Sequence, residues 1–222
     1  MAEYEIWKFL HICMFVFWLG TDVGVMLCSK KSVDPALSIE ARFQMLEMAL
    51  KIELLPRVMW VMALPFGVHL SATLGYISPS ATINALMWVF TFAWLIINVG
   101  GAANLNKEWG QSLSKINRYI VALLGLGLII VSISSFMGNG PFDPNSVALK
   151  VGLYGLVNLT ILGIEIAFCP LGQSFERLAI EGSAPDLESE ISGGMSKTLG
   201  WVHATYMLIF IVAFIGATKI IG

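Results

Sequence analysis

The sequence predicts an all-α membrane protein, a bundle of about six transmembrane helices with a cytoplasmic amphipathic helix between the first and the second. Of its 222 residues, 57% are hydrophobic and only 13% are charged, and the mean hydropathy is +0.78. Soluble proteins carry about 25% charged residues, so a chain of this size cannot cover its apolar side chains with polar surface. Several apolar runs also approach the ~20 residues that cross a bilayer. A water-soluble domain is therefore excluded.

Six apolar segments are separated by polar or turn-forming residues, and we expect each to form one helix. The second begins near Pro56, and Ser78-Pro79-Ser80 separate it from the third. The predicted spans are 7–28, 56–77, 82–103, 117–137, 147–169 and 199–221. Together they form a single domain over residues 1–222.

Two of the connections are long enough to hold structure of their own. In the first, Asp34-Pro35 is a typical helix start, and apolar residues then recur at helical spacing: Ile39, Phe43, Leu46, Leu50 and Leu54. We expect an amphipathic helix that lies along the inner membrane surface or docks beneath the bundle. The connection from Pro170 to Lys197 is acidic and contains Gly193-Gly194, which suggests a mobile loop or a docking surface.

The distribution of Lys and Arg predicts the orientation of the chain. Ten of the thirteen basic residues lie in the first, third and fifth connections, and only Lys8, Lys150 and Lys219 lie on the other side. We therefore expect an integral protein of a bacterial inner membrane, with both termini outside, on the periplasmic side. The net charge of -2 and the absence of a basic tract argue against nucleic acid as a partner.

Two histidines are expected at similar depth. His11 lies about one turn inside the outer end of the first helix, and His69 lies about two turns inside the outer end of the second. Because consecutive spans are antiparallel, both fall in the outer leaflet, at depths that differ by ~6 Å at 1.5 Å per residue. Histidine is a usual axial ligand of haem iron, and two imidazoles on neighbouring helices can face each other across a haem. The alternative is that each hydrogen-bonds a facing helix.

The fifth span carries a polar stripe of Lys150, Tyr154, Asn158 and Glu165, which must point into the bundle. Lys150 starts the stripe at the level of His11 and His69. It can neutralise a haem propionate, act as a ligand, or extend to the lipid headgroups. Tyr154 follows one turn further in and belongs to the same candidate cofactor-binding set.

The inner end of the bundle holds a second set of polar residues. Glu165 ends the stripe near the inner face, where Asp22 and His203 are also expected. These three residues form a candidate proton-accepting cluster. His203 could alternatively ligate a second haem with a partner other than histidine.

The first seventy residues resemble the HemJ-type protoporphyrinogen oxidase and CopD-like superfamily of small haem-binding membrane proteins. The motifs that carry the resemblance are Trp7-Lys8-x-Leu10-His11-Ile12, Phe17-Trp18-Leu19-Gly20, Arg42-Phe43 with Met45, Pro56-Arg57, and Leu149-Lys150-Val151-Gly152-Leu153. The resemblance implies a b-type haem, with His11 matching the histidine of the family's first helix and Lys150 matching its functional lysine. The chain departs from the family in having six expected spans, where the family usually has four.

These observations predict a haem b membrane redox protein that transfers electrons or oxidises a porphyrinogen-type substrate. Its partners would be the lipid bilayer, haem, and a redox protein or a second copy of the chain. Whether it is an enzyme stays open. A CopD-like copper transporter and a non-catalytic membrane anchor of a larger complex are the alternatives.

Overall fold

The computed structural model describes residues 2–142 and 145–218, and all the regular elements in these residues are α-helices. The helices are α1 (Ala2–Ser32), α2 (Ile39–Ile52), α3 (Leu54–Thr73), α4 (Ala81–Ala103), α5 (Glu108–Phe136), α6 (Asn145–Phe168), α7 (Leu171–Glu181) and α8 (Pro185–Thr218). Six stretches of the described chain are long and apolar enough to cross a membrane. The predicted all-α bundle of about six transmembrane helices is thereby confirmed, while residues 219–221 of the last predicted span lie outside the described residues.

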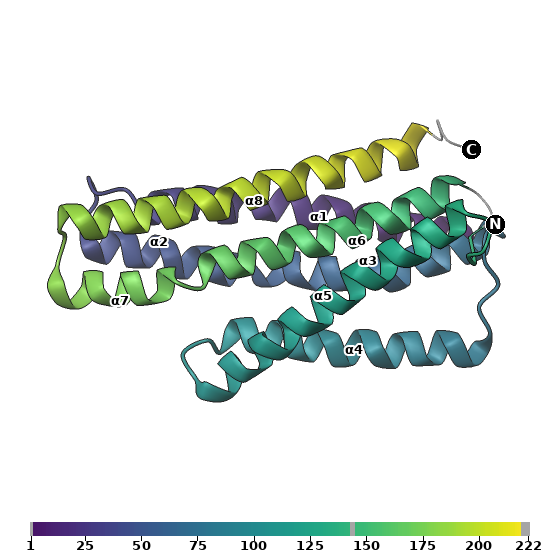
Figure 1. Cartoon of the computed structure of the whole chain (residues 1–222), viewed down its shortest axis with the longest axis horizontal. Helices are drawn as coiled ribbons and strands as arrows, with labels where there is room; N and C mark the ends of the chain where they lie inside the picture. The colour runs from purple at the N-terminus through teal and green to yellow at the C-terminus, as the bar shows by residue number, and fades with distance from the viewer. Residues whose placement is uncertain (1, 143–144, 219–222) are drawn as a thin grey trace.

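The six long helices form a ring. Consecutive neighbours around it are α1, α3, α4, α5, α6 and α8, and α8 returns to contact α1. Figure 1 shows that α1 begins and α8 ends at the same end of the bundle, which we call the termini end. The opposite end, where α2 and α7 lie, is called the α7 end. The centre of the ring is filled by large buried side chains, including Trp18, Trp60 and Trp94.

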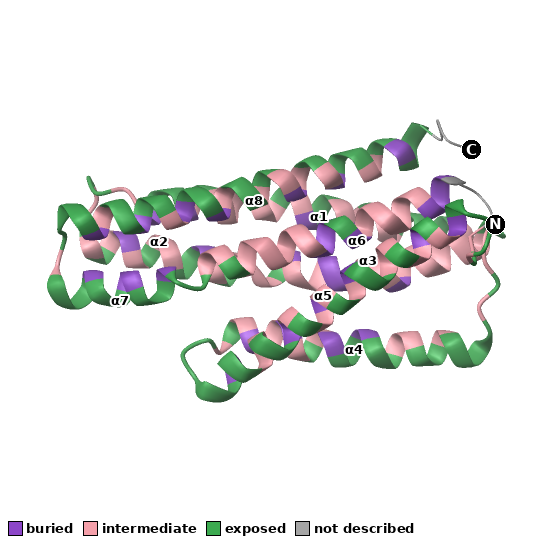
Figure 2. Cartoon of the chain, viewed as in Figure 1, coloured by how far each residue is buried: buried purple, intermediate pink, exposed green. Residues whose placement is uncertain are grey.

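The exterior of the bundle is apolar, as a lipid environment requires. Many large hydrophobic side chains are exposed on it, for example Phe9, Leu86, Ile96, Leu123 and Ile130. Figure 2 shows exposed residues along the outer faces of the long helices and buried residues along the faces that meet. In water such a surface would drive aggregation, whereas in a bilayer it meets hydrocarbon.

The connection that we expected to be a mobile loop or docking surface is helical instead. Residues 171–181 form α7, and α8 begins at Pro185, well before the predicted start of the last span. Each of the two helices buries one apolar face in a shared cluster, made by Leu171, Phe175, Leu178, Leu187, Ile191 and Met195. The acidic residues obscured this helical spacing: Glu176, Glu181, Asp186 and Glu190 are exposed, whereas Glu188 is partly buried.

Arg42 holds the amphipathic helix α2 against the α7 end of the bundle. Its side chain is 1% exposed. Nε donates to the Ser32 carbonyl at 2.9 Å, and Nη1 and Nη2 donate to the two carboxylate oxygens of Glu188 at 2.7 and 3.0 Å. A bidentate pair of this kind fixes orientation as well as distance. Of the two placements considered for this helix, the structure has the docked one, with α1, α2 and α8 joined by one guanidinium.

Small residues allow α5 and α6 to pack closely. A Cβ at Gly155 would lie 2.7 Å from the Gly125 carbonyl oxygen and 2.8 Å from a side-chain carbon of Ile129. Nearby, the Ser132 hydroxyl donates to the Ala148 carbonyl at 2.7 Å. Membrane helices associate through such small-residue contacts and interhelical hydrogen bonds, because lipid is as apolar as a leucine side chain.

Gly155→Ala is expected to destabilise the bundle by about 1–3 kcal/mol, the range for overpacking a close interface. The added methyl group would meet the backbone of α5, which cannot rotate away. Gly127→Ala is the matched control, because a Cβ at Gly127 meets nothing within 4 Å. Thermal unfolding of the two variants in the same detergent, followed by circular dichroism, compares them. Equal melting temperatures would contradict this account of the α5–α6 contact.

Candidate functional site

His11 is partly buried, at the termini end of the bundle. Its Nδ1 atom is buried and has no hydrogen-bond partner among the described residues. The edge of the ring faces Gly67 of α3, where a Cβ would lie 3.9 Å from Cε1. On α6, Lys150 lies close enough for its charge to act on the imidazole. The structure therefore brings together two of the predicted site residues, His11 and Lys150.

His69 has partners of a different kind. Its Nε2 accepts a hydrogen bond of 2.9 Å from Nε1 of Trp88 on α4. Its ring is stacked on the ring of Trp7 from α1, with centroids 4.1 Å apart and planes 6° apart. Trp7 precedes His11 by one helical turn on α1. The α1 side chain that stacks on His69 is therefore Trp7 and not His11. The two histidines lie at the same end of the bundle, but the contacts of each are with other residues.

The polar stripe on α6 points into the bundle, as the cost of exposing it to lipid predicts. The Tyr154 hydroxyl donates to the Trp60 carbonyl at 2.9 Å, and Trp60 Nε1 donates to Asn158 Oδ1 at 3.2 Å. The Asn158 amide donates back to the Tyr154 carbonyl on its own helix at 2.7 Å. Tyr154 and Asn158 thus join α6 to α3 through the centre of the ring.

Glu165, which ends the stripe, pairs with arginine and asparagine side chains. Its Oε1 accepts from Arg57 Nη1 at 2.9 Å and from Asn117 Nδ2 at 3.0 Å. Its Oε2 lies 3.9 Å from Arg118 Nε. These three partners come from α3 and α5, and two of them donate hydrogen bonds to Oε1, whereas Oε2 has an ionic contact only.

Arg57 is the centre of this network, and sequence reasoning missed that role. Besides Glu165 it binds Glu53 Oε1, through Nε at 2.9 Å and Nη2 at 2.7 Å, and its Nη1 donates to Asn98 Oδ1 at 2.9 Å. Its side chain is 17% exposed. In the sequence Arg57 counted only as a marker of orientation. The sequence signal for this role was the place of Arg57 at the start of an apolar span, together with asparagines at corresponding depths in two other spans.

The second acidic residue of the predicted inner cluster, Asp22, lies near Arg57 of α3 and Glu53, the residue that precedes α3, and it faces Tyr206 of α8. The Tyr206 hydroxyl is buried and faces Asp22, without a hydrogen bond of normal geometry. His203 is exposed on α8, and its ring lies 6.4 Å from that of Tyr206, centroid to centroid. Tyr206 therefore lies near both Asp22 and His203.

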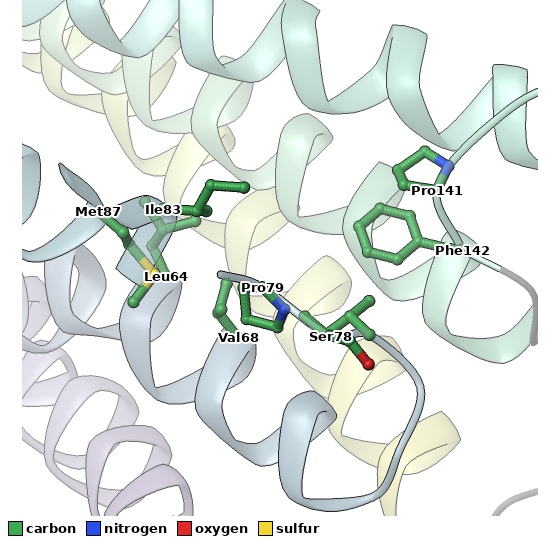
Figure 3. Close-up of a pocket in the computed structure, with 9 residues that line it drawn as sticks. Leu64, Val68, Ser78, Pro79, Ile83, Met87, Pro141 and Phe142 are labelled. Atoms are coloured by element: carbon green, nitrogen blue, oxygen red, sulfur yellow. The ribbon is translucent and has the colours of Figure 1, made fainter. Parts of the chain in front are cut away.

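An apolar pocket opens beside the His69–Trp88 pair. It has a volume of about 400 Å³ and lies between α3, α4 and the connection that follows α5 (Figure 3). The lining residues are Leu64, Val68, Ile77, Ser78, Pro79, Ile83, Met87, Pro141 and Phe142. Among the described residues, no histidine, cysteine, lysine or acidic side chain lines it, so the described lining is apolar surface without a nitrogen or carboxylate ligand for a metal.

The described residues contain no group of three or more histidine, cysteine or acidic side chains that could hold a metal ion. The histidines are spread over three places, and Cys13, Cys28 and Cys169 are free thiols. An all-protein metal cage of the kind that binds zinc is therefore not present in residues 2–142 and 145–218.

Comparison with known proteins finds no relative: no family model, curated protein or solved structure matches the chain. The resemblance to the HemJ-type and CopD-like superfamily stays a prediction from the sequence. What the structure defines is the class, an all-α integral membrane protein with polar groups at two levels of its interior.

Arg57→Met is expected to destabilise the protein by about 3–5 kcal/mol, because removing one partner of a buried ion pair leaves the other charges uncompensated. The control is Arg177→Met, whose 48%-exposed side chain pairs with Glu181 and Glu190, and exposed pairs contribute only ~0–1 kcal/mol. Unfolding in detergent measures both. The double variant Arg57→Met with Glu165→Met should recover part of the lost stability. A double variant less stable than either single variant would be inconsistent with pairing.

Proposed function

We propose that the chain is a haem b-binding redox protein of the membrane, with His11 as an axial ligand of the iron at the termini end of the bundle. The observation that carries the proposal is the partly buried His11 imidazole, whose buried Nδ1 has no hydrogen-bond partner in the described chain and on which the charge of Lys150 acts. A buried polar atom normally has a partner. Imidazole nitrogen is a usual haem ligand, so a bound haem would supply a reason for this arrangement.

The surroundings of His11 suit a flat apolar group with acidic substituents. Gly67 leaves the edge of the His11 ring without a facing side chain at that position. Lys150 contributes a positive charge at the same level, which would stabilise a propionate carboxylate. Trp7 and Phe66, with ring centroids 6.1 Å apart, add aromatic surface close by.

The second axial position has two candidates, His69 and Lys150. His69 would have to exchange its hydrogen bond from Trp88 for a bond to iron and separate from the Trp7 ring. Lys150 is already beside His11, and it is also the lysine that matches the resembling family. Ligation by two strong nitrogen donors favours electron transfer, whereas an open position would suit oxidation of a porphyrinogen.

When bound, the haem would supply a one-electron couple within the membrane. The chain's own contribution would be to hold the ligand, to exclude water from it with the aromatic side chains of α1 and α3, and to balance the propionate charge with Lys150. The predominance of basic residues in the connections at the α7 end supports an orientation with that end in the cytoplasm and both termini on the periplasmic side of a bacterial inner membrane.

The optical spectrum of protein purified from haem-replete cells tests the proposal directly. We expect a Soret band and, after reduction, separate α and β bands. His11→Ala should abolish these bands, because it removes the ligand. His203→Ala is the matched control, since His203 is exposed on the far side of Tyr206, and it should keep them.

Two more variants assign the second ligand. Loss of the bands in His69→Ala identifies a bis-histidine haem, and loss or displacement in Lys150→Met identifies the lysine. A colourless wild-type protein, or an unchanged spectrum in folded His11→Ala, would refute the haem proposal.

A further inference from the structure

The interior of the bundle holds three carboxylates near one arginine. Glu53 and Glu165 both bind Arg57 directly, and Glu165 also lies near Arg118. Two negative charges are thus balanced by two positive ones. Asp22 brings a third carboxylate into the same region, where the Glu53 carboxylate repels it and the Arg57 guanidinium attracts it, and among the described residues Asp22 forms no salt bridge with Arg57.

A hydroxyl group faces this extra carboxylate. Tyr206 of α8 faces Asp22 of α1, and its hydroxyl oxygen is buried without a hydrogen-bond partner among the described residues. A second orphan atom belongs to the Arg57 network itself, the side-chain nitrogen of Asn98, a residue that is 1% exposed. Buried polar groups are usually satisfied, so this region contains hydrogen-bonding capacity that the ion pairs do not use.

We propose that Asp22 is a reversible proton-binding site inside the membrane. In a medium of low dielectric constant an uncompensated charge is strongly disfavoured, and Glu53 and Glu165 already take the direct bonds of Arg57. One proton on an Asp22 carboxylate oxygen neutralises the third charge, and the resulting O–H can donate to the Tyr206 oxygen. No electron and no other reactant takes part, so the inference does not depend on the haem proposal.

The same contacts supply a route for the proton. The Tyr206 hydroxyl can both donate and accept, and His203, one turn nearer to the α7 end of α8, is exposed. Their rings lie nearly perpendicular, at 80°. A proton from the aqueous phase at the α7 end would pass His203 and Tyr206 before it reaches Asp22. Of the three residues predicted to form an inner proton cluster, this path uses Asp22 and His203 and leaves Glu165 paired with Arg57.

Infrared spectroscopy of the purified protein in lipid nanodiscs tests the site. We expect a carboxylic-acid C=O stretching band at neutral pH that disappears reversibly at alkaline pH. Labelling aspartate with carbon-13 at the side-chain carboxyl should move the band. Asp22→Asn should remove it, and Asp186→Asn, the same substitution at an exposed residue at the start of α8, should not.

A further variant keeps the test valid if Asp22→Asn does not fold. Tyr206→Phe retains the carboxyl but removes its hydroxyl neighbour, and it should shift both the frequency of the band and the pH at which it disappears. The absence of a protonated aspartate band in the wild type at neutral pH would overturn the proposal. So would persistence of the band in folded Asp22→Asn, or an unchanged band in Tyr206→Phe.

Discussion

The rest of the bundle depends on the hydrogen bonds and ion pairs that the Arg57 guanidinium makes. Its bonds to Glu53, Asn98 and Glu165 join α3, α4 and α6, and Asn117 extends the network to α5. In lipid the hydrophobic effect does not hold helices together, so the ring must be closed by polar groups and close backbone approach. Four of its six helices contribute to the network of Arg57 and Glu165, and these bonds set the register of the four helices along the bundle axis.

Towards the termini end, the network continues beyond this charged level through two tryptophans and the uncharged side chains to which they are bonded. Trp94 Nε1 donates to Asn117 at 2.9 Å, and Trp60 joins Asn158 and Tyr154. The two indole rings meet edge to face, with centroids 5.2 Å apart. Neutral donors and acceptors thus lie between the region around His11 and the ion pairs.

The spans were predictable from the sequence because each needs about twenty apolar residues, and the inward direction of the α6 stripe was predictable because lipid penalises exposed polar groups. The partners of these polar side chains were not predictable. Arg57 and Glu165 are 108 positions apart, and which faces meet depends on the rotation of each helix about its own axis. The same rotation covers His69 with Trp7, and an apolar pattern alone does not determine it. The helix α7 was missed because its acidic composition suggested a loop.

The length of α8 connects the two levels of the molecule mechanically. Its 34 residues extend about 51 Å at 1.5 Å per residue, well beyond the ~30 Å of hydrocarbon in a bilayer. The first part buries Met195 in the cluster at the α7 end, and the second carries Tyr206 into the bundle. Since the helix between them is continuous, the packing of Met195 in the cluster at the α7 end and the position of the Tyr206 hydroxyl beside Asp22 depend on the placement of the same helix.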